Sequence, residues 1–347
     1  MVGYLVRRCI RLVVSLVVVS IIPFGLLQMV PGSFGELSQL ASGSGLGGTD
    51  TAEAAAQLEE RYGEGTPAWR QYLTFMQGAV TGDMGPSYKY PQLTVEQIIA
   101  DAFPVSLTLA ALATALTLVI AVPIGVLAAL RKDTFADYGS MFTLTTIQAL
   151  PGYLFALVLI LIFAAGLGWL PTSGWSGPQN LIIPVIALAV QPTAMLARYV
   201  RSSMLEALRE EYVVAAYAKG GTPGAVTIRH ALRNSLIPVV TVVGPIFAAL
   251  ATGTVFIEAL MGIPGLGMFF TVAARSRDVP LLMGTTLFFA LIIMVLNLLV
   301  DLLYGVLDPR IRHERTTGRR RRRGKQEPEG EGHTTPATLA GGLEVRA

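Results

Sequence analysis

Charged side chains are scarce in this sequence. Asp, Glu, Lys and Arg together make up 14% of its 347 residues, whereas a soluble domain typically carries about 25%. Hydrophobic residues make up 52%, and the mean hydropathy is +0.57. This balance excludes an ordinary soluble domain and indicates a membrane protein.

Residues that bind metals or carry catalysis are also rare. The single cysteine, Cys9, excludes an internal disulfide and a cysteine-based zinc site. The three histidines (His230, His313 and His333) lack the spacing of metal ligands. The P-loop frame GxxxxGK[ST] is missing, so ATP hydrolysis by that route is not expected. No Ser/His/Asp arrangement is defensible from spacing, and we expect no active site, metal or cofactor in this chain.

Long apolar runs occupy much of the remainder. They predict an all-α polytopic membrane protein with six transmembrane helices, in runs 12–30, 104–130, 142–166, 181–200, 236–257 and 281–307. The first run exceeds the apolar core of a signal peptide and lacks a clean cleavage site after it, which favours a transmembrane helix. Pro104 is expected to begin the second helix, and Pro151 lies inside the third run.

The predicted organisation has four parts. Residues 1–30 form the first transmembrane helix, 31–103 an extracytoplasmic insertion, 104–310 a five-helix core with a polar loop at 206–235, and 311–347 a disordered basic tail. Within the insertion, the composition predicts a flexible glycine-rich stretch at 42–48, helices at 51–62 and around 69–73, and a turn at 82–87.

The distribution of basic residues predicts the orientation. With the N-terminus in the cytoplasm, 21 of the 26 Lys and Arg residues fall on the cytoplasmic side, as do both chain ends. The run Arg319–Arg323 is interpreted as an anchor at the inner leaflet rather than as a site for RNA, with acidic lipid as a further alternative. We therefore expect a bacterial inner-membrane protein that contacts lipid and no nucleic acid.

The polar loop has the pattern of two short helices joined at a bend. Glu210 and Glu211 suit a helix N-terminus, and Gly220-Gly221 supplies a left-handed stop. Thr222 is then an N-cap followed by Pro223 at the first position of a second helix, which runs toward Arg233. An amphipathic helix on the bilayer surface is the alternative interpretation.

VAAYAKG at 214–220, followed by RHALRNSLIPV at 229–239, resembles the cytoplasmic coupling loop of ABC importer permeases in the dipeptide/oligopeptide/nickel branch. Val214 stands where the general motif has Glu, Ala215, Ala216 and Gly220 match, and Pro238 comes later than in the general pattern. Segment 258–267, EALMGIPGLG, is similar to the Glu-x-x-x-x-x-Pro-Gly-Leu-Gly segment of the same branch. From the residues alone, it is a span end followed by a turn and a short re-entrant or interfacial piece at 268–274.

The resemblance covers residues 1 to about 312 and implies a permease subunit of an ATP-driven, binding-protein-dependent importer for di- or oligopeptides. It also implies a second homologous permease, two P-loop ATPase subunits that hold ATP and magnesium, and an extracytoplasmic binding protein. The resemblance assigns the coupling to the ATPases to eight residues: Glu211, Ala215, Ala216, Lys219, Gly220, Arg229, His230 and Arg233. It assigns the pore and its extracytoplasmic mouth to Gln191, Glu258, Pro264, Gly265 and Gly267.

Three alternatives stay open at this point. Nickel or another small solute is handled by similar permeases. A secondary transporter or channel would need no ATPase, but membrane-embedded charge for ion coupling is scarce. A membrane enzyme or a scaffold with an arginine tail is the third alternative.

Overall fold

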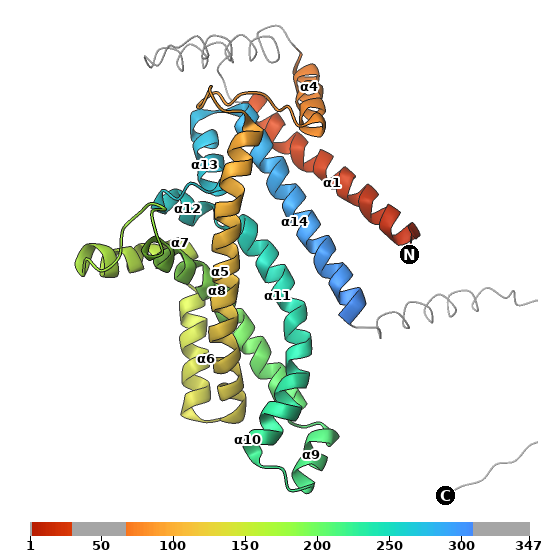
Figure 1. Ribbon diagram of the computed structural model, residues 1–347, viewed down its shortest axis with the longest axis vertical. Helices are drawn as coiled ribbons and strands as arrows, with labels where there is room; N and C mark the ends of the chain where they lie inside the picture. Colours follow the sequence, from red (N-terminus) through yellow and green to blue (C-terminus); the bar gives the residue numbers. More distant parts are fainter. Residues whose placement is uncertain (1, 30–66, 308–347) are drawn as a thin grey trace, which may run out of the picture. The chain divides into compact units, whose positions relative to one another are not determined.

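The computed structural model describes residues 2–29 and 67–307, and these residues are almost entirely helical (Figure 1). Among them, the only extended pairing is one isolated bridge between Pro86 and Thr94. The longer helices are α1 (Val2–Gln28), α4 (Ala68–Thr81), α5 (Val95–Leu130), α6 (Phe135–Gln148), α8 (Gln179–Ala207), α11 (Arg233–Gly253), α13 (Leu266–Ser276) and α14 (Val279–Leu307). The expected all-α class is confirmed. The expectations for 42–48, for a helix at 51–62 and for the tail 311–347 lie outside the described residues.

Four segments are long and apolar enough to cross a membrane: Val95–Leu130, Gln179–Ala207, Pro223–Gly253 and Val279–Val300. Two further pairs of helices pass the same test when each pair is taken together, which gives up to six candidate spans. The described apolar part of α1, Ile10–Leu26, is shorter. By length and composition, the chain is a multi-pass membrane protein.

The second span begins earlier than expected, because Pro104 lies inside α5 rather than at its start. Helix α5 begins after Thr94, whose hydroxyl accepts a hydrogen bond from the Gln97 amide while the Gln97 side chain accepts one from the Thr94 amide. This reciprocal capping box satisfies two amides that the helix itself cannot pair. It therefore fixes the start of α5 nine residues before the proline.

The third apolar run is not a single helix. Helix α6 ends at Gln148, Pro151 is the N-cap of α7 (Gly152–Leu159), and the π-helical segment η1 (Ile160–Gly166) follows. The two arms, Phe135–Gln148 and Gly152–Gly166, are bent by 98°. Proline lacks an amide hydrogen and disfavours helical geometry in the residue before it, so the chain ends one helix and starts another here.

The fifth run is also divided differently from the prediction. Helix α10 (Pro223–Val226) continues through the π-helical turn η2 (Thr227–Leu232) into α11, so the second helix of the polar loop is continuous with the span. The helix ends at Gly253, before the expected end at Ile257, and α12 (Val255–Met261) follows. Helices α12 and α13 are bent by 80°, which agrees with the predicted turn and short re-entrant piece.

Helices α5 and α8 form the central pair of the bundle. Their shared surface is lined by small buried residues: Ala113, Ala121, Gly125 and Ala129 on α5, and Ala187, Ala194 and Ala197 on α8. At Gly125 the helices approach so closely that a β-carbon would lie 2.6 Å from the Ala197 carbonyl oxygen and 2.7 Å from the Val200 β-carbon. The Thr117 hydroxyl also donates to the Ala189 carbonyl across the pair, at 3.4 Å. Small residues of this kind allow helices to pack tightly in lipid.

Replacing Gly125 with alanine should separate α5 from α8 and lower the free energy of unfolding by about 1–3 kcal/mol, the range for overpacking. The matched change is Gly253→Ala at the end of α11, where an added β-carbon meets nothing within 4 Å. That variant should be neutral or slightly stabilising. Thermal unfolding of the full chain in detergent measures both, and equal melting temperatures would contradict this account of the packing.

Candidate functional site

The polar loop, here called the coupling segment (residues 206–235), begins with the short helix α9 (Glu211–Ala218). Its end forms a Schellman motif: the Gly221 amide donates to the Ala216 carbonyl at 3.2 Å, and the Gly220 amide donates to the Tyr217 carbonyl at 2.9 Å. Gly220 has φ +82°, a left-handed conformation that glycine adopts without strain. The predicted glycine stop at the end of the first helix is therefore confirmed.

The bend that follows depends on a close approach at Gly221. A β-carbon there would lie 2.6 Å from Cγ2 of Val226 and 2.9 Å from the Ala216 carbonyl oxygen. Thr222 occupies the N-cap position of α10 in extended backbone, but its side chain makes no capping hydrogen bond. Pro223 at the first helical position fixes the start of α10. Gly220 and Gly221 thus have different roles, since the first supplies the dihedral angle and the second supplies the space.

A buried apolar cluster fastens the coupling segment to the ends of the central pair. It contains Ala129 of α5, Met204 and Ala207 of α8, Val213 of α9, Val226 of α10 and Ala231 of η2. A second tie lies beside it, where the Ser203 hydroxyl of α8 donates to the Ser235 carbonyl of α11 at 2.8 Å. Because this core joins the segment to α5 and α8, and the Ser203–Ser235 bond joins α8 to α11, the segment cannot shift without moving the ends of these helices.

Outside the residues packed on this cluster, the surface of α9 is exposed, and much of it is apolar. Tyr212, Val214 and Tyr217 of α9 have exposed fractions of 39%, 60% and 41%, and Ile228 of η2 has 67%. Large exposed apolar side chains on so short a helix are typical of a docking site for another protein. Such a surface fits a partner that seats on α9.

The residues assigned to coupling all lie in this segment, but they do not share one environment. Ala215 is exposed, whereas Ala216 is half-buried and packs against the apolar cluster of the segment. The other six are exposed: Glu211, Lys219, Gly220, Arg229, His230 and Arg233. Of the two alanines, only Ala215 is exposed.

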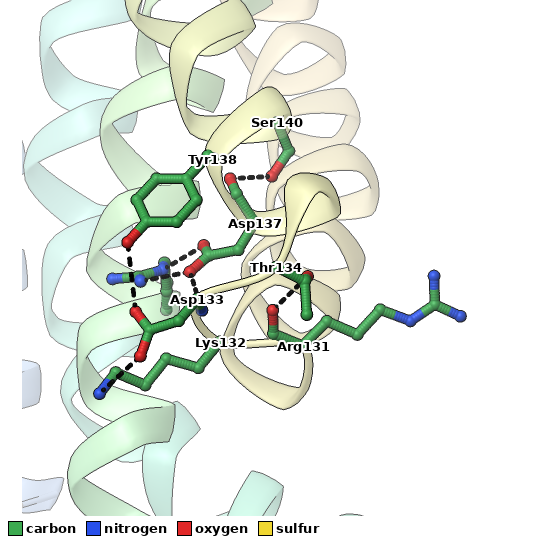
Figure 2. Close-up of polar contacts among 8 residues, drawn as sticks. Arg131, Lys132, Asp133, Thr134, Asp137, Tyr138 and Ser140 are labelled. Atoms are coloured by element: carbon green, nitrogen blue, oxygen red, sulfur yellow. Dashed lines mark hydrogen bonds and ion pairs between the residues drawn. The ribbon is translucent and has the colours of Figure 1, made fainter.

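An ion pair that the sequence analysis missed lies next to the coupling segment. The Asp137 carboxylate, which is 1% exposed, accepts hydrogen bonds from Nε and Nη2 of Arg201, both at 2.6 Å. The Asp133 amide donates to the same carboxylate at 3.1 Å (Figure 2). This two-pronged pair ties the start of α6 to the last part of α8.

Two more polar contacts join α6 to α8 farther along. Nη2 of Arg198 donates to the Gln148 side chain at 2.5 Å, and Nη1 donates to the Thr145 hydroxyl at 3.3 Å. Nε2 of Gln191 donates to the Leu150 carbonyl at 3.2 Å, at the bend before α7. Gln191, assigned to the pore from sequence, therefore contacts the α6–α7 bend. Together with Asp137, these contacts form a polar ladder between two antiparallel helices.

The segment predicted to form the mouth is organised by Glu258. This side chain of α12 is fully buried, and its Oε2 accepts hydrogen bonds from the Gly267 amide at 2.7 Å and the Met268 amide at 3.4 Å. A carboxylate is favourable at a helix N-terminus, where amides lack intrahelical partners. The Leu266 amide, just before these two, donates to the Ser106 hydroxyl of α5 at 2.9 Å. Glu258 and Ser106 thus hold the start of α13 from two sides.

Glycine is required on both sides of Leu266. A β-carbon on Gly265 would overlap the Glu258 carboxylate and lie 2.7 Å from the Ser106 hydroxyl. One on Gly267 would lie 2.9 Å from Oε2 of Glu258 and would also meet the backbone of Val255. Pro264 is exposed at the tip of the turn. The structure therefore brings Glu258, Pro264, Gly265 and Gly267 together in one turn, with Gln191 placed elsewhere.

Asp278 fixes the neighbouring loop to the start of α14. Its carboxylate accepts hydrogen bonds from the Ser87 hydroxyl, from the Lys89 amide at 3.0 Å and from the Leu281 amide at 3.1 Å. Burial raises the pKa of the Asp278 carboxyl above its usual value, although these donors oppose the shift. The site joins loop 82–90, of which 82–87 was predicted as a turn, to the helix that follows α13.

These features define a class of protein. A bundle of membrane-crossing helices, with an exposed, firmly fastened helical bend and a sharply bent helix pair, fits the transmembrane subunit of a transporter. The chain belongs to the family described as binding-protein-dependent transport system inner membrane component, whose model matches residues 121–313. The model of the N-terminal region of such components matches residues 1–110. The chain is thus an inner-membrane permease component.

Similar proteins include two peptide transport permeases. The dipeptide transport system permease protein DppB of Bacillus subtilis is 37% identical over 313 residues, covering 90% of this chain and 98% of that protein. The oligopeptide transport system permease protein OppB of Haemophilus influenzae is 36% identical over 315 residues, covering 90% of this chain and all of that protein. A solved structure of the MetNI methionine ABC transporter superposes with a TM-score of 0.53 at 16% identity, over 61% of this chain and 96% of that one. That likeness confirms the fold.

Replacing Asp137 with asparagine should lower the free energy of unfolding by about 2 kcal/mol, since it removes charged hydrogen bonds and leaves the Arg201 guanidinium without its counter-ion. The matched variant is Asp133→Asn, because Asp133 is 61% exposed and pairs with Lys132, itself 44% exposed. Exposed pairs contribute little, so its effect should stay below about 0.5 kcal/mol. Thermal unfolding of the purified chain gives both values. A larger loss at Asp133 than at Asp137 would contradict this assignment.

Glu258→Ala should destabilise the chain by about 1–3 kcal/mol, because the amides at the start of α13 lose their hydrogen-bond acceptor. Glu258→Gln keeps an acceptor oxygen at that position and should lose less than half as much. Alanine at the exposed Glu206 provides the baseline for removing a glutamate. The assay is the melting temperature of each variant in the same detergent. If alanine and glutamine lower it equally, the capping role of the carboxylate is wrong.

Proposed function

We propose that this chain imports di- or oligopeptides as one of two permease subunits in an ATP-driven, binding-protein-dependent transporter. Its family membership and the names of the similar permeases support this proposal and favour peptides over nickel. In the proposed topology, six spans place both chain ends in the cytoplasm, with the coupling segment on the same side.

The proposed partners are those expected of such a transporter. Two P-loop ATPase subunits hold ATP and magnesium, and one of them seats on the exposed face of α9 around Ala215 and Val214. A second homologous permease completes the pore, and an extracytoplasmic binding protein delivers substrate near the α12–α13 turn. The observation that carries the proposal is the coupling segment, which combines exposed apolar side chains on α9 with a buried core shared with α5 and α8.

In the proposed mechanism, closure of the ATPases displaces α9 and α10 as one rigid piece. Val213 and Val226 pass the displacement to the ends of α5 and α8 through the apolar cluster. The Asp137–Arg201 pair then makes α6 follow α8. Tilting of these helices switches access from one face of the membrane to the other, a population shift between two packed arrangements.

A bulky residue on the outer side of α9 should uncouple transport. In the full complex reconstituted in proteoliposomes with its ATPases and binding protein, Ala215→Trp should reduce ATP-driven uptake of labelled peptide about tenfold. That loss corresponds to about 1.4 kcal/mol of docking energy. The matched variant is Lys132→Trp in the exposed loop between α5 and α6, which should keep uptake within about twofold of the unsubstituted chain.

Three results would count against the proposal. Full uptake by the Ala215→Trp complex would remove α9 from the ATPase contact. Peptide uptake without ATPases would favour a secondary transporter. Uptake of Ni²⁺ and not of peptides would leave the importer class intact but make the substrate wrong.

A further inference from the structure

Helix α4 carries an exposed apolar stripe that the transport mechanism does not use. Trp69, Leu73 and Val80 have exposed fractions of 64%, 55% and 84%. At about 100° per residue, these three positions fall within roughly 40° of the helix circumference. Arg70, Gln77 and Thr81 are also exposed and occupy the next sector of roughly 40°. The exposed surface of α4 is thus divided lengthwise into an apolar half and a polar half.

The rotation of α4 about its axis is fixed by contacts on its other faces. Phe75, which is 2% exposed, packs with Val279, Met283 and Leu287 of α14. Beside it, the Tyr72 hydroxyl lies 2.6 Å from the Ser20 hydroxyl of α1. Because these contacts hold α4 from two sides, the apolar stripe cannot turn inward.

The apolar stripe lies on the side of α4 that adjoins α1. In order around the helix, Tyr72 and Met76 come next to Trp69, Val80 and Leu73, and the polar sector follows beyond them. The Tyr72 ring lies 5.4 Å from the Phe24 ring of α1, centroid to centroid. Phe24 and Ser20 both fall inside the apolar part of α1, Ile10–Leu26.

Away from Ser20 and Phe24, the surface of α1 is itself exposed and apolar. Ile21, Ile22 and Leu26 are each between 51% and 60% exposed. The stripe on α4 therefore lies beside a helix whose exposed surface suits acyl chains, along the part of α1 that is apolar. A 14-residue helix is about 21 Å long, too short to span a bilayer.

We propose that α4 is an interfacial helix, with its Trp69–Leu73–Val80 stripe immersed in the lipid beside α1 and its Arg70–Gln77–Thr81 side in water. Tryptophan is the residue that favours this boundary, since its ring is apolar and its indole N–H is polar. Immersion of one face to about 5–10 Å is typical of such helices. The inference rests on α1 being a membrane span, as in the proposed topology.

Fluorescence quenching of Trp69 tests the proposal. The full chain contains three tryptophans, so Trp169→Phe and Trp175→Phe leave Trp69 as the only emitter. In nanodiscs, phosphatidylcholine brominated near the headgroup end of its acyl chains should reduce the emission at least about twofold, as expected for a side chain at that depth. Lipid brominated near the chain ends should quench less, and aqueous iodide should quench weakly.

Gln77→Trp combined with Trp69→Phe is the matched control, because it places the emitter two turns along the same exposed surface but in the polar sector. Its emission should respond to iodide more than to brominated lipid. Ile22→Trp in a chain with Trp69, Trp169 and Trp175 all changed to Phe tests α1 itself. If that emitter is not quenched by brominated lipid, the proposed topology fails; if it is quenched and Trp69 is not, only the α4 proposal fails.

The other outcomes are equally decisive. Quenching of Trp69 by iodide alone would leave the stripe facing water, available to a soluble partner. Quenching by neither reagent would mean that another segment of this chain covers it, and either result overturns the proposal. If the tryptophan-depleted chain does not fold, a spin label at Val80→Cys with Cys9→Ser replaces the measurement. Its collisions with oxygen should then exceed those with a water-soluble nickel chelate.

Discussion

The close packing of α5 against α8 is the constraint on which the rest of this structure depends. Lipid is as apolar as leucine, so helices in a membrane gain little from burying large apolar side chains and associate instead through fitted small residues. Gly125 allows the backbone of α8 to lie against α5, and alanines continue this close contact along both helices. Helix α5 is 36 residues long and contributes to the clusters at the coupling segment, in the middle of the bundle and around α13. The positions of α9, α11 and α13 are therefore all set relative to this pair.

Three buried carboxylates join elements that apolar packing alone would hold weakly. Asp137 joins α6 to α8, Glu258 joins α12 to α13, and Asp278 joins loop 82–90 to α14. Each accepts at least two hydrogen bonds, as is expected where an unpaired charge would be costly. Their donors differ in kind, since Arg201 supplies a charge whereas Glu258 receives only backbone amides. Removing one member of the charged pair leaves the other charge without a partner. The Glu258 cap depends instead on the close approach that glycine allows at 265 and 267.

Local rules predicted the coupling segment well and the long-range contacts poorly. The stop at Gly220 and the start at Pro223 follow from conformational preferences of single residues, so sequence alone was enough. Pro104 carried a start signal that the Thr94–Gln97 capping box overrides, and Pro151 could equally have kinked one helix or separated two. The Asp137–Arg201 pair joins residues 64 positions apart, and only tertiary packing brings them together. Both residues are plain in the sequence, but nothing in it indicates that they pair.

The two sharp bends are placed where a transporter with a rigid central pair would have to yield. Helices α5 and α8 each run as one continuous helix, whereas the chain is interrupted at 149–151 and at 262–265. The two interruptions are neighbours in space, because Tyr153 of α7 contacts Phe256 of α12 and Ala156 shares a core with Ile257. Gln191 of α8 holds the Leu150 carbonyl at the first bend. Under the proposed function, a displacement of α8 driven from the coupling segment reaches both bends through these contacts. Rotation at the bends would then change the α12–α13 turn without breaking the packing of α5 on α8.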